Sequence, residues 1–333
     1  MVGDIYALTK SRLHSYGLFS DATIRTVADV ARAQQKHASF RDLFKEVGIP
    51  TVATHTTQSG RAVTYVDLPA KSKTATNTLV LHTSMGNPLD PNQLFQVATI
   101  AAANPRYRII AFGNPSGAPH YIKQQGLRPA DWFAVAFTKN VQSIVDAELD
   151  YLRSQGVTHA IHAGYSYGAL KAVVEAIHSE KGSVDGIILV DPVASPRSPV
   201  RLAKDFARTY EPLGSYVNRV ELPSYHEARG ESAKIREYRK TLLRPINIAI
   251  GLFLARADIL QYLQKASERH PKARVVVAWG TESELGDTNR LQDGIQQLEA
   301  DGFLVEPLPL HGDKHALAND IYLHAAIIHK ALT

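Results

Sequence analysis

From about residue 60 onward, short runs of β-branched and apolar residues alternate with longer segments whose apolar residues recur at three-and-four spacing. The short runs end in Gly, Pro or Asp and are typical of strands, whereas the longer segments are typical of amphipathic helices. This alternation predicts an α/β fold with a mostly parallel sheet, because parallel neighbours are joined by crossovers that are usually helical. The expected strands are 62–67, 78–82, 107–112, 159–163, 186–190, 273–279 and 304–308.

Helix-length segments lie between several of these runs. Two of the strands contain stretches that are apolar throughout, Ile187 to Val190 and Val275 to Ala278, as expected of parallel strands covered on both faces. The patterns together predict a doubly wound sheet with helices on each side. The clearest helices are expected over 92–103, 132–154 and 167–178.

Two regions depart from the alternation. Residues 1–50 precede the sheet and have helical patterning, with Ser20 or Asp21 as the N-cap of a segment that runs to Ala33. Residues 197–272 separate two strands by far more than the few residues typical of such connections. We therefore expect a helical extension over 1–50, a core over 51–196 and 273–333, and a helical cap or lid over 197–272.

The composition is that of a folded globular protein, with 44% hydrophobic and 21% charged residues in 333. The chain has no cysteine, which excludes a thiolate nucleophile, a Cys-based zinc site and disulfides, and which fits a reducing compartment. The net charge of +5 is small and dispersed, so nucleic acid is not an expected partner.

The chain also lacks the expected marks of export or membrane insertion. The first 13 residues carry Asp4, Lys10 and Arg12 and contain no apolar core of a signal peptide. The most apolar run, from Ile246 to Ala255, has about half of the roughly 18 residues that a membrane span requires. We expect a soluble, cytoplasmic protein without a membrane span, and the sequence leaves a homo-oligomer open.

One motif carries specific chemistry. The segment Gly164-Tyr165-Ser166-Tyr167-Gly168 follows the 159–163 strand and leads directly into a helical pattern. A G-x-S-x-G sequence between strand and helix is typical of a sharp turn that projects the serine hydroxyl above the sheet. Ser166 is therefore the candidate nucleophile, and the alternative is a glycine-rich turn in which Ser166 only caps the helix.

Through this motif, its strand-to-helix context and the α/β alternation, the chain resembles the α/β-hydrolase family over roughly residues 60–333. The resemblance implies a catalytic acid after a later strand and a histidine after the last strand, in that order along the chain. His315 is the implied histidine, because it stands three residues after Gly312 and just before a helix, as in the family's Gly-x-x-His turn. His311 is the alternative, nearer the strand end.

The resemblance leaves the acid open. The family usually places its carboxylate three residues after the glycine that closes the penultimate strand, and here Gly280 is followed at that spacing by Ser283. The carboxylates close to this position are Glu282, Glu284 and Asp287.

A second position is available for the acid. Asp191 directly follows the 187–190 run, at the end of the preceding strand, where some members of the family carry the acid. Its alternative role is a structural Asp-Pro turn. Asp287 has a simpler interpretation as the N-cap of the helix expected from Asn289. Asp191 is the preferred acid, and Glu284 and Glu282 are kept as alternatives.

The resemblance also implies an oxyanion hole built from two backbone N–H groups. One comes from the residue after the nucleophile, Tyr167, and the other from the loop Leu81 to Pro88, where Thr83 or Ser84 would donate. Thr83 replaces the family's first glycine in this loop, so the loop geometry is expected to differ. His82 is expected to be a packed residue at the strand end rather than a catalytic residue.

The segment 197–272 is where substrate preference is expected to reside. It contains an apolar run that follows a basic stretch, which would suit an acyl-binding wall beside a site for an acidic group or a membrane surface. The simpler interpretation, which we favour, is a solvated helix face followed by a helix buried against the core. The basic residues are Lys234, Arg236, Arg239, Lys240 and Arg244, and the apolar residues are Ile246, Ile248, Ile250, Leu252, Phe253 and Leu254.

The sequence therefore predicts a serine hydrolase that cleaves a carboxylic ester or thioester of a small molecule through an acyl-enzyme, without a metal or cofactor. Two alternatives remain open. The same residues would also suit amide or C–C bond cleavage or acyl transfer. A receptor or carrier that has kept the turn around Ser166 but lost its acid is the second alternative, and Ser283 at the usual acid position favours it.

Overall fold

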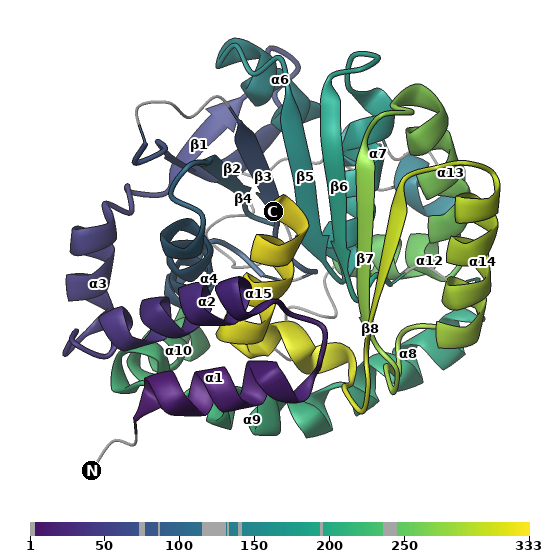
Figure 1. The fold of residues 1–333 in the computed structure, drawn as a ribbon. Coiled ribbons are helices and arrows are strands. Elements are labelled where there is room, and N and C mark those ends of the chain that lie inside the picture. Colours follow the sequence, from purple (N-terminus) through teal and green to yellow (C-terminus); the bar gives the residue numbers. More distant parts are fainter. Residues whose placement is uncertain are drawn as a thin grey trace.

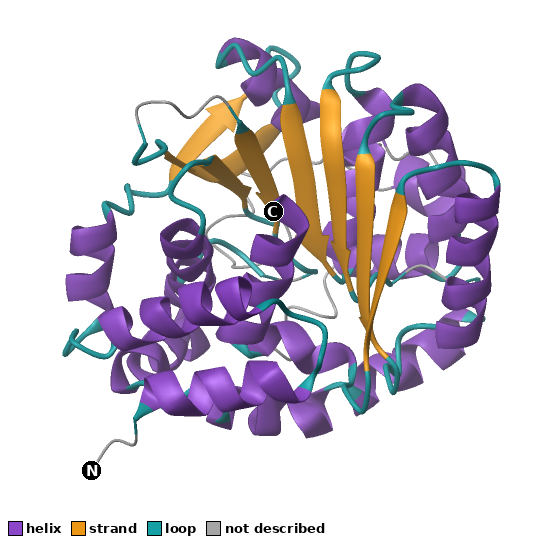
Figure 2. Ribbon diagram, viewed as in Figure 1, coloured by secondary structure: helices purple, strands orange, loops and turns teal. Residues whose placement is uncertain are grey.

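A central sheet flanked by helices forms the molecule in the computed structural model (Figures 1 and 2). The structure describes residues 4–72, 77–85, 87–114, 131, 133–138, 142–193, 196–235 and 245–333. Within them the sheet has eight strands in the order β1-β2-β4-β3-β5-β6-β7-β8. The strands are β1 (Ala53–Thr56), β2 (Ala62–Leu68), β3 (Thr78–His82), β4 (Arg108–Phe112), β5 (Ala160–Tyr165), β6 (Val184–Val190), β7 (Arg274–Gly280) and β8 (Val305–Leu310).

The mostly parallel α/β sheet is confirmed. Strands β4, β3, β5, β6, β7 and β8 pair in parallel, whereas β1 pairs antiparallel to β2 and β2 antiparallel to β4. All seven expected strands are present with small shifts at their ends, and the pattern did not predict β1. The Ala-Thr-His-Thr sequence of β1 has no buried residue, so it lacks the apolar alternation that identifies a strand.

Alternate side chains of the central strands enter separate cores on the two faces of the sheet. On β6, Ile188 and Val190 belong to one apolar cluster, while Ile187 and Leu189 belong to the other. The first cluster includes residues of α4 (Pro91–Ala103) and α15 (Ile321–Leu332), and the second includes residues of α7 (Tyr167–His178), α13 (Ile259–Arg269) and α14 (Thr288–Ala300) (Figure 1). This arrangement explains why β6 has no polar alternation.

The continuous helix predicted over 132–154 is wrong. The described part contains a π-helical turn, η2 (Ala134–Thr138), a 3₁₀ turn, η3 (Gln142–Ile144), and then α6 (Asp146–Ser154), while residues 132 and 139–141 lie outside the described residues. The carboxylates of Asp131 and Asp146 both bind Arg61, just before β2. A straight α-helix would place two residues fifteen positions apart about 22 Å from each other, too far for one guanidinium to bind both.

The N-terminal residues form three helices, α1 (Ile5–Ser15), α2 (Asp21–Gln34) and α3 (Phe40–Val47), that pack on the core. Ser20 caps α2 as expected, and its side chain accepts a hydrogen bond from Thr23 N. The buried side chain of Gln34 donates to Thr99 Oγ1 on α4 and accepts from the Tyr322 hydroxyl on α15. Apolar residues of all three helices belong to the same cluster as α4 and α15, so this extension covers one face of the molecule (Figure 1).

The 197–272 segment is helical. Helices α8, α9 and α10 lie near the carboxyl ends of the parallel strands, whereas α13 packs against α7 beside the sheet (Figure 1). The division into core and lid remains a prediction. The helices are α8 (Pro199–Arg208), α9 (Tyr210–Asn218), α10 (Pro223–Ile235), α12 (Pro245–Leu254) and α13.

The apolar run of this segment forms α12, which packs against α8 and η2. Ile250 and Phe253 are buried in the cluster that contains α7, while Ile248 is 49% exposed. Most of the expected basic stretch, Arg236, Arg239, Lys240 and Arg244, lies outside the described residues. Among the helices that the structure describes, none is both long enough and apolar enough to cross a bilayer.

A buried histidine makes the stability of the fold sensitive to acid. His324 on α15 is 6% exposed, and burial lowers the pKa of its imidazole from 6.5 to about 4. The unfolded chain therefore takes up a proton on His324 near pH 6.5, while the folded protein resists protonation until about pH 4. The contribution of neutral His324 to stability is present above pH 6.5 and is lost as the pH falls toward 4.

The wild type should lose unfolding free energy as the pH falls from 7 to 4.5. We expect His324→Gln to lose less over the same range, by on the order of 2 to 3 kcal/mol. Urea denaturation at several pH values measures this difference. The matched control is His311→Gln, because His311 is exposed. Equal pH dependence of His324→Gln and the wild type would contradict the prediction.

Candidate active site

The turn between β5 and α7 holds Ser166 in an unusual backbone conformation, with φ 60° and ψ −123°. The flanking glycines permit it, because the chain approaches itself closely there. A Cβ atom on Gly164 would lie 2.1 Å from the Gly168 carbonyl oxygen, and one on Gly168 would lie 2.3 Å from the His82 carbonyl oxygen. The G-x-S-x-G sequence is therefore required by the packing of this turn, and residues of this conformation cluster at functional sites.

The structure brings Ser166 and His315 together across 149 residues of sequence. His315 begins the short helix η4 (His315–Asn319) after β8, and its Nε2 lies 2.9 Å from Ser166 Oγ. Tyr165 supports the imidazole: its hydroxyl donates to the His315 carbonyl oxygen at 2.7 Å, and its ring stacks on the imidazole at a centroid distance of 5.3 Å. The alternative histidine, His311, has an exposed side chain.

Asp191 is the carboxylate that meets the imidazole. It follows β6 with φ 43°, and His315 Nδ1 donates a short hydrogen bond to its Oδ2. Its other oxygen accepts from Gly280 N at 3.0 Å, and its own N–H donates to the Ala278 carbonyl oxygen at 2.6 Å. These bonds attach Asp191 to the end of β7, so its carboxylate is fixed before any ligand binds.

Ser283 makes a contact that the sequence did not predict. Its hydroxyl donates to Asp191 Oδ2 at 2.7 Å, the same oxygen that accepts from His315. The residue at the position where the resemblance placed an acid thus binds the Asp191 carboxylate, which follows the preceding strand. No local signal identifies this role, because the two residues are 92 positions apart.

The alternative carboxylates occupy other places. Glu284 Oε2 accepts from the main-chain N–H of His315 at 3.3 Å and does not reach the ring. Glu282 is exposed. Asp287 caps α14, as its position suggested, and accepts from Arg290 N at 3.2 Å.

A second set of contacts supports the loop that carries His315. The Tyr216 hydroxyl, on α9, donates to Asp313 Oδ1 at 2.9 Å and accepts from Lys314 N at 2.7 Å. Burial raises the pKa of Tyr216, so its hydroxyl remains a donor across the ordinary pH range. Arg219 Nη1 donates to the same Asp313 oxygen at 3.3 Å. A helix of the 197–272 segment therefore positions the histidine loop, a role that the sequence did not predict.

The start of α7 and the loop after β3 contain the backbone groups expected near Ser166. Tyr167 is the first residue of α7, at the helix N-terminus, where unpaired N–H groups favour negative charge. In the loop after β3, Thr83 N already donates to the Phe112 carbonyl oxygen at 3.3 Å, while Ser84 lines the cavity beside Ser166. Of the two expected donors from this loop, Ser84 is the one at the cavity. Gly86 lies outside the described residues.

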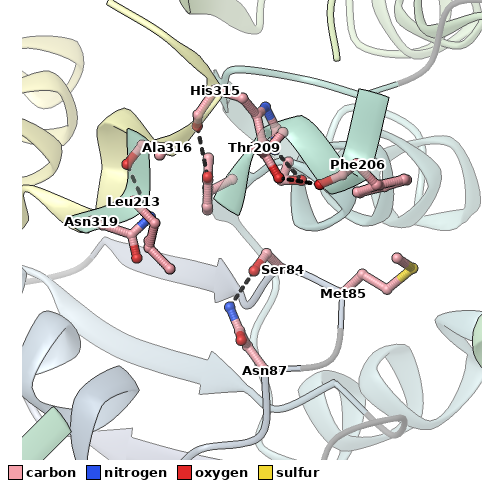
Figure 3. A pocket seen from close by; sticks show the side chains of 11 residues that line it. Ser84, Met85, Asn87, Phe206, Thr209, Leu213, His315, Ala316 and Asn319 are labelled. Atoms are coloured by element: carbon pink, nitrogen blue, oxygen red, sulfur yellow. Dashed lines mark hydrogen bonds between the residues drawn. The ribbon is translucent and has the colours of Figure 1, made fainter. Parts of the chain in front are cut away.

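A cavity of about 100 Å³ opens onto Ser166 and His315 (Figure 3). Ser84 and Met85 come from the loop after β3, and Phe206 and Leu213 come from α8 and α9. The Asn87 amide donates to Ser84 Oγ and thereby fixes this wall of the cavity (Figure 3). The described lining consists of Ser84, Met85, Asn87, Tyr165, Ser166, Phe206, Thr209, Leu213, His315, Ala316 and Asn319.

The close approach of Gly164 to Gly168 leads to a stability prediction. Gly164→Ala places a methyl group against backbone that cannot move without displacing α7, so we expect a loss of about 2 to 3 kcal/mol or more of unfolding free energy. Gly230→Ala on α10 is the control, because a methyl group at that position would have nothing within 4 Å and alanine favours helix. Urea denaturation compares the two variants. Similar stability of both would contradict the close packing of the turn.

Comparisons with known proteins bear on the fold. No protein-family model matches the sequence, and no curated protein matches it significantly. Solved structures do match, among them a carboxylesterase of the thaumarchaeon Nitrososphaera gargenis, with 16% identity, a TM-score of 0.54, and coverage of 80% of this chain and 93% of that one.

Two further structures are similar. An esterase of Pyrococcus furiosus is 15% identical with a TM-score of 0.53, covering 87% of this chain and 94% of that one. A thioesterase domain from the curacin biosynthetic pathway is 16% identical with a TM-score of 0.54, and the match covers 85% of this chain and 100% of that domain. At these identities the likeness concerns the fold. The sheet order, the turn around Ser166 and these structural matches together show that the chain has the α/β-hydrolase fold.

Proposed function

We propose that the protein is a serine hydrolase that cleaves a carboxylic ester or thioester of a small molecule. The observation that carries the proposal is the 2.9 Å contact between Ser166 Oγ and His315 Nε2 at a strained turn beside a cavity. A nucleophile within hydrogen-bond reach of a base that is itself oriented by a third group is the signature of covalent catalysis. The names of the similar structures, esterases and a thioesterase, favour ester-type substrates.

In the proposed reaction, Ser166 Oγ attacks the carbonyl carbon of the substrate while His315 Nε2 takes the hydroxyl proton. The tetrahedral oxyanion is met by the N–H groups of Tyr167 and Ser84. Collapse of this intermediate breaks the bond to the alcohol or thiol, which leaves with the proton held by His315. Water then attacks the acyl-enzyme with His315 again acting as base, and the carboxylic acid product leaves Ser166 free.

We propose Asp191 as the third catalytic group, with Ser283 as its support. A carboxylate at Nδ1 fixes the tautomer in which Nε2 accepts the serine proton, and it stabilises the imidazolium that forms. The Asp191–His315 hydrogen bond supports this role, whereas Glu284 contacts only the main chain of His315. It also argues against a receptor that has lost its acid.

Helices α8 and α9 are proposed to form the part of a lid that contacts the acyl group. Phe206 and Leu213 supply apolar surface to the cavity, and Thr209 lies between them in sequence. Cavities lined in this way fix substrate preference through shape and apolar contact, so this part of 197–272 is the proposed determinant of acyl specificity.

The nucleophile can be tested without knowing the substrate. We expect a fluorophosphonate probe to label the wild type at Ser166, and Ser166→Ala to abolish labelling, because only a serine beside a base reacts rapidly. His315→Ala should also abolish labelling. Gel fluorescence and peptide mapping measure the modified residue.

The matched controls are Ser59→Ala and His311→Ala, which change an exposed serine and the exposed alternative histidine. Both should label as the wild type does. Labelling of wild-type Ser166 no faster than of a surface serine would contradict the proposal and favour a binding protein.

The acid can be tested by paired substitutions. We expect Asp191→Asn to lower kcat for a generic ester by about 100-fold or more, because an amide favours the wrong tautomer of His315. Glu284→Gln should lower it by less than about 10-fold. Steady-state kinetics with a chromogenic ester measures both.

Ser283 permits a sharper version of this experiment. Its hydroxyl lies 2.7 Å from the Asp191 carboxylate, so Ser283→Asp in the Asp191→Asn background would supply a carboxylate beside the same imidazole. We expect it to restore part of the lost turnover, while Glu282→Gln in the wild type has no effect. An equal fall in kcat in Asp191→Asn and Glu284→Gln would contradict the assignment of Asp191 as the acid.

A further inference from the structure

A buried cluster of charged side chains lies on the α7 side of the turn that holds Ser166, and the proposed reaction does not use it. At its centre is His82, the last residue of β3, whose side chain is fully buried. Its Nε2 lies 2.7 Å from Glu175 Oε2 and its Nδ1 lies 3.4 Å from Glu148 Oε2. Neither contact is aligned as a hydrogen bond, but both are ion-pair contacts. A carboxylate close to each nitrogen favours the charged form of the imidazole, which carries a proton on both nitrogens.

The rest of the cluster balances this charge. His162 on β5 donates through Nδ1 to Glu175 at 2.8 Å, and Lys171 on α7 binds Glu148 on α6. All these side chains are at most 2% exposed. Two carboxylates and one ammonium leave one negative charge, and a buried charge without a partner is costly. One proton shared with His82 makes the cluster neutral.

A metal ion is the alternative occupant. His82, His162 and Glu175 offer ligand atoms within 4.8 Å of one another, which suits a two-histidine, one-carboxylate site. Zn²⁺ would displace the His82 proton and, with Lys171 beside Glu148, would leave a net positive charge in the buried cluster. His82 bound through one nitrogen would keep the proton on the other, so only the charge distinguishes the two occupants. The charge balance of the cluster favours a proton over a metal.

His82 is joined directly to the catalytic surroundings. It is followed in sequence by Thr83 and Ser84. Its carbonyl oxygen packs against Gly168, so closely that a Cβ atom on Gly168 would lie 2.3 Å from it. The side chain thus connects the loop carrying the proposed second oxyanion donor to α6 and to α7. We propose that His82 is an imidazolium at neutral pH that positions the loop carrying Ser84 against the Ser166 turn. It would thereby be a positioning residue for the oxyanion hole.

The electrostatics of the cluster agree with this geometry. Burial lowers the pKa of His82, but the carboxylates of Glu175 and Glu148 outweigh burial, so the pKa is raised above 6.5. For Glu175, burial raises the pKa, and the imidazoles of His82 and His162 reverse this and lower it. The stability that charged His82 contributes is therefore present below pH 6.5 and lost as the pH rises through its folded value. This direction is opposite to that of His324.

The charge can be measured directly in the wild type. Protein labelled with ¹⁵N-histidine, with the His82 signals assigned by their absence in His82→Gln, reports whether each ring nitrogen carries a proton. We expect both His82 nitrogens to be protonated at pH 7.5, while His324 is neutral. A neutral His82 at this pH would overturn the inference. A rise in melting temperature on adding Zn²⁺ that His82→Gln abolishes would also overturn it, in favour of a metal site.

The positioning role rests on the proposed function and needs kinetics. We expect His82→Gln to lower kcat for a chromogenic ester by about 10-fold or more with KM within about 2-fold, because only the transition state uses the oxyanion donors. The matched control is His162→Gln, which also removes an imidazole beside Glu175 but lies on β5 and not on the strand that leads to Ser84. Its kcat should stay within about 3-fold of the wild type.

Several outcomes separate the possibilities. The positioning role would be overturned if His82→Gln left kcat unchanged or raised only KM. It would also be overturned if His162→Gln lowered kcat as much as His82→Gln does. If His82→Gln does not fold, Glu148→Gln, which removes one of the two carboxylates, should lower kcat in the same way, and no loss would overturn it. A wild type that turns over no ester and is not labelled at Ser166 refutes the proposed function itself, and a doubly protonated His82 in that sample would be structural only.

Discussion

The close approach of β5 and α7 at the Ser166 turn is the constraint on which the site depends. Gly164 and Gly168 let backbone meet backbone at distances that no side chain tolerates. This contact fixes the N-terminus of α7 at the carboxyl edge of the sheet, where β6 delivers Asp191 and the loop after β8 delivers His315. The three side chains meet because neighbouring parallel strands end at the same edge.

Sequence patterns were sufficient where the determining interactions are local. The apolar runs of the central strands and the turn around Ser166 are specified by consecutive residues, so their positions could be predicted. The sequence preferred Asp191 as the candidate acid but left Glu284 and Glu282 open. Asp191 and His315 are 124 positions apart, and the glutamate nearest the expected position, Glu284, contacts the main chain of His315 instead of its ring. Only the folded arrangement distinguishes them.

Other differences also reflect long-range contacts. The helix predicted over 132–154 is interrupted where Asp131 and Asp146 both bind Arg61. The helical pattern of that segment gives no sign of this distant partner. The role of Ser283 depends on a partner 92 positions away. Each case involves a polar side chain whose partner is distant in sequence, which hydrophobic periodicity does not encode.

The packing of α2 on α4 and α15 also sets an order of events in protein synthesis. Gln34 bonds to Tyr322, 288 positions later in the chain, and the apolar residues Ile24 and Val27 share a cluster with residues of α15. While the ribosome makes the intervening residues, α2 is already complete but has no α15 to cover its apolar side. The apolar side of α2 therefore stays uncovered by its native partner until α15 has been synthesised.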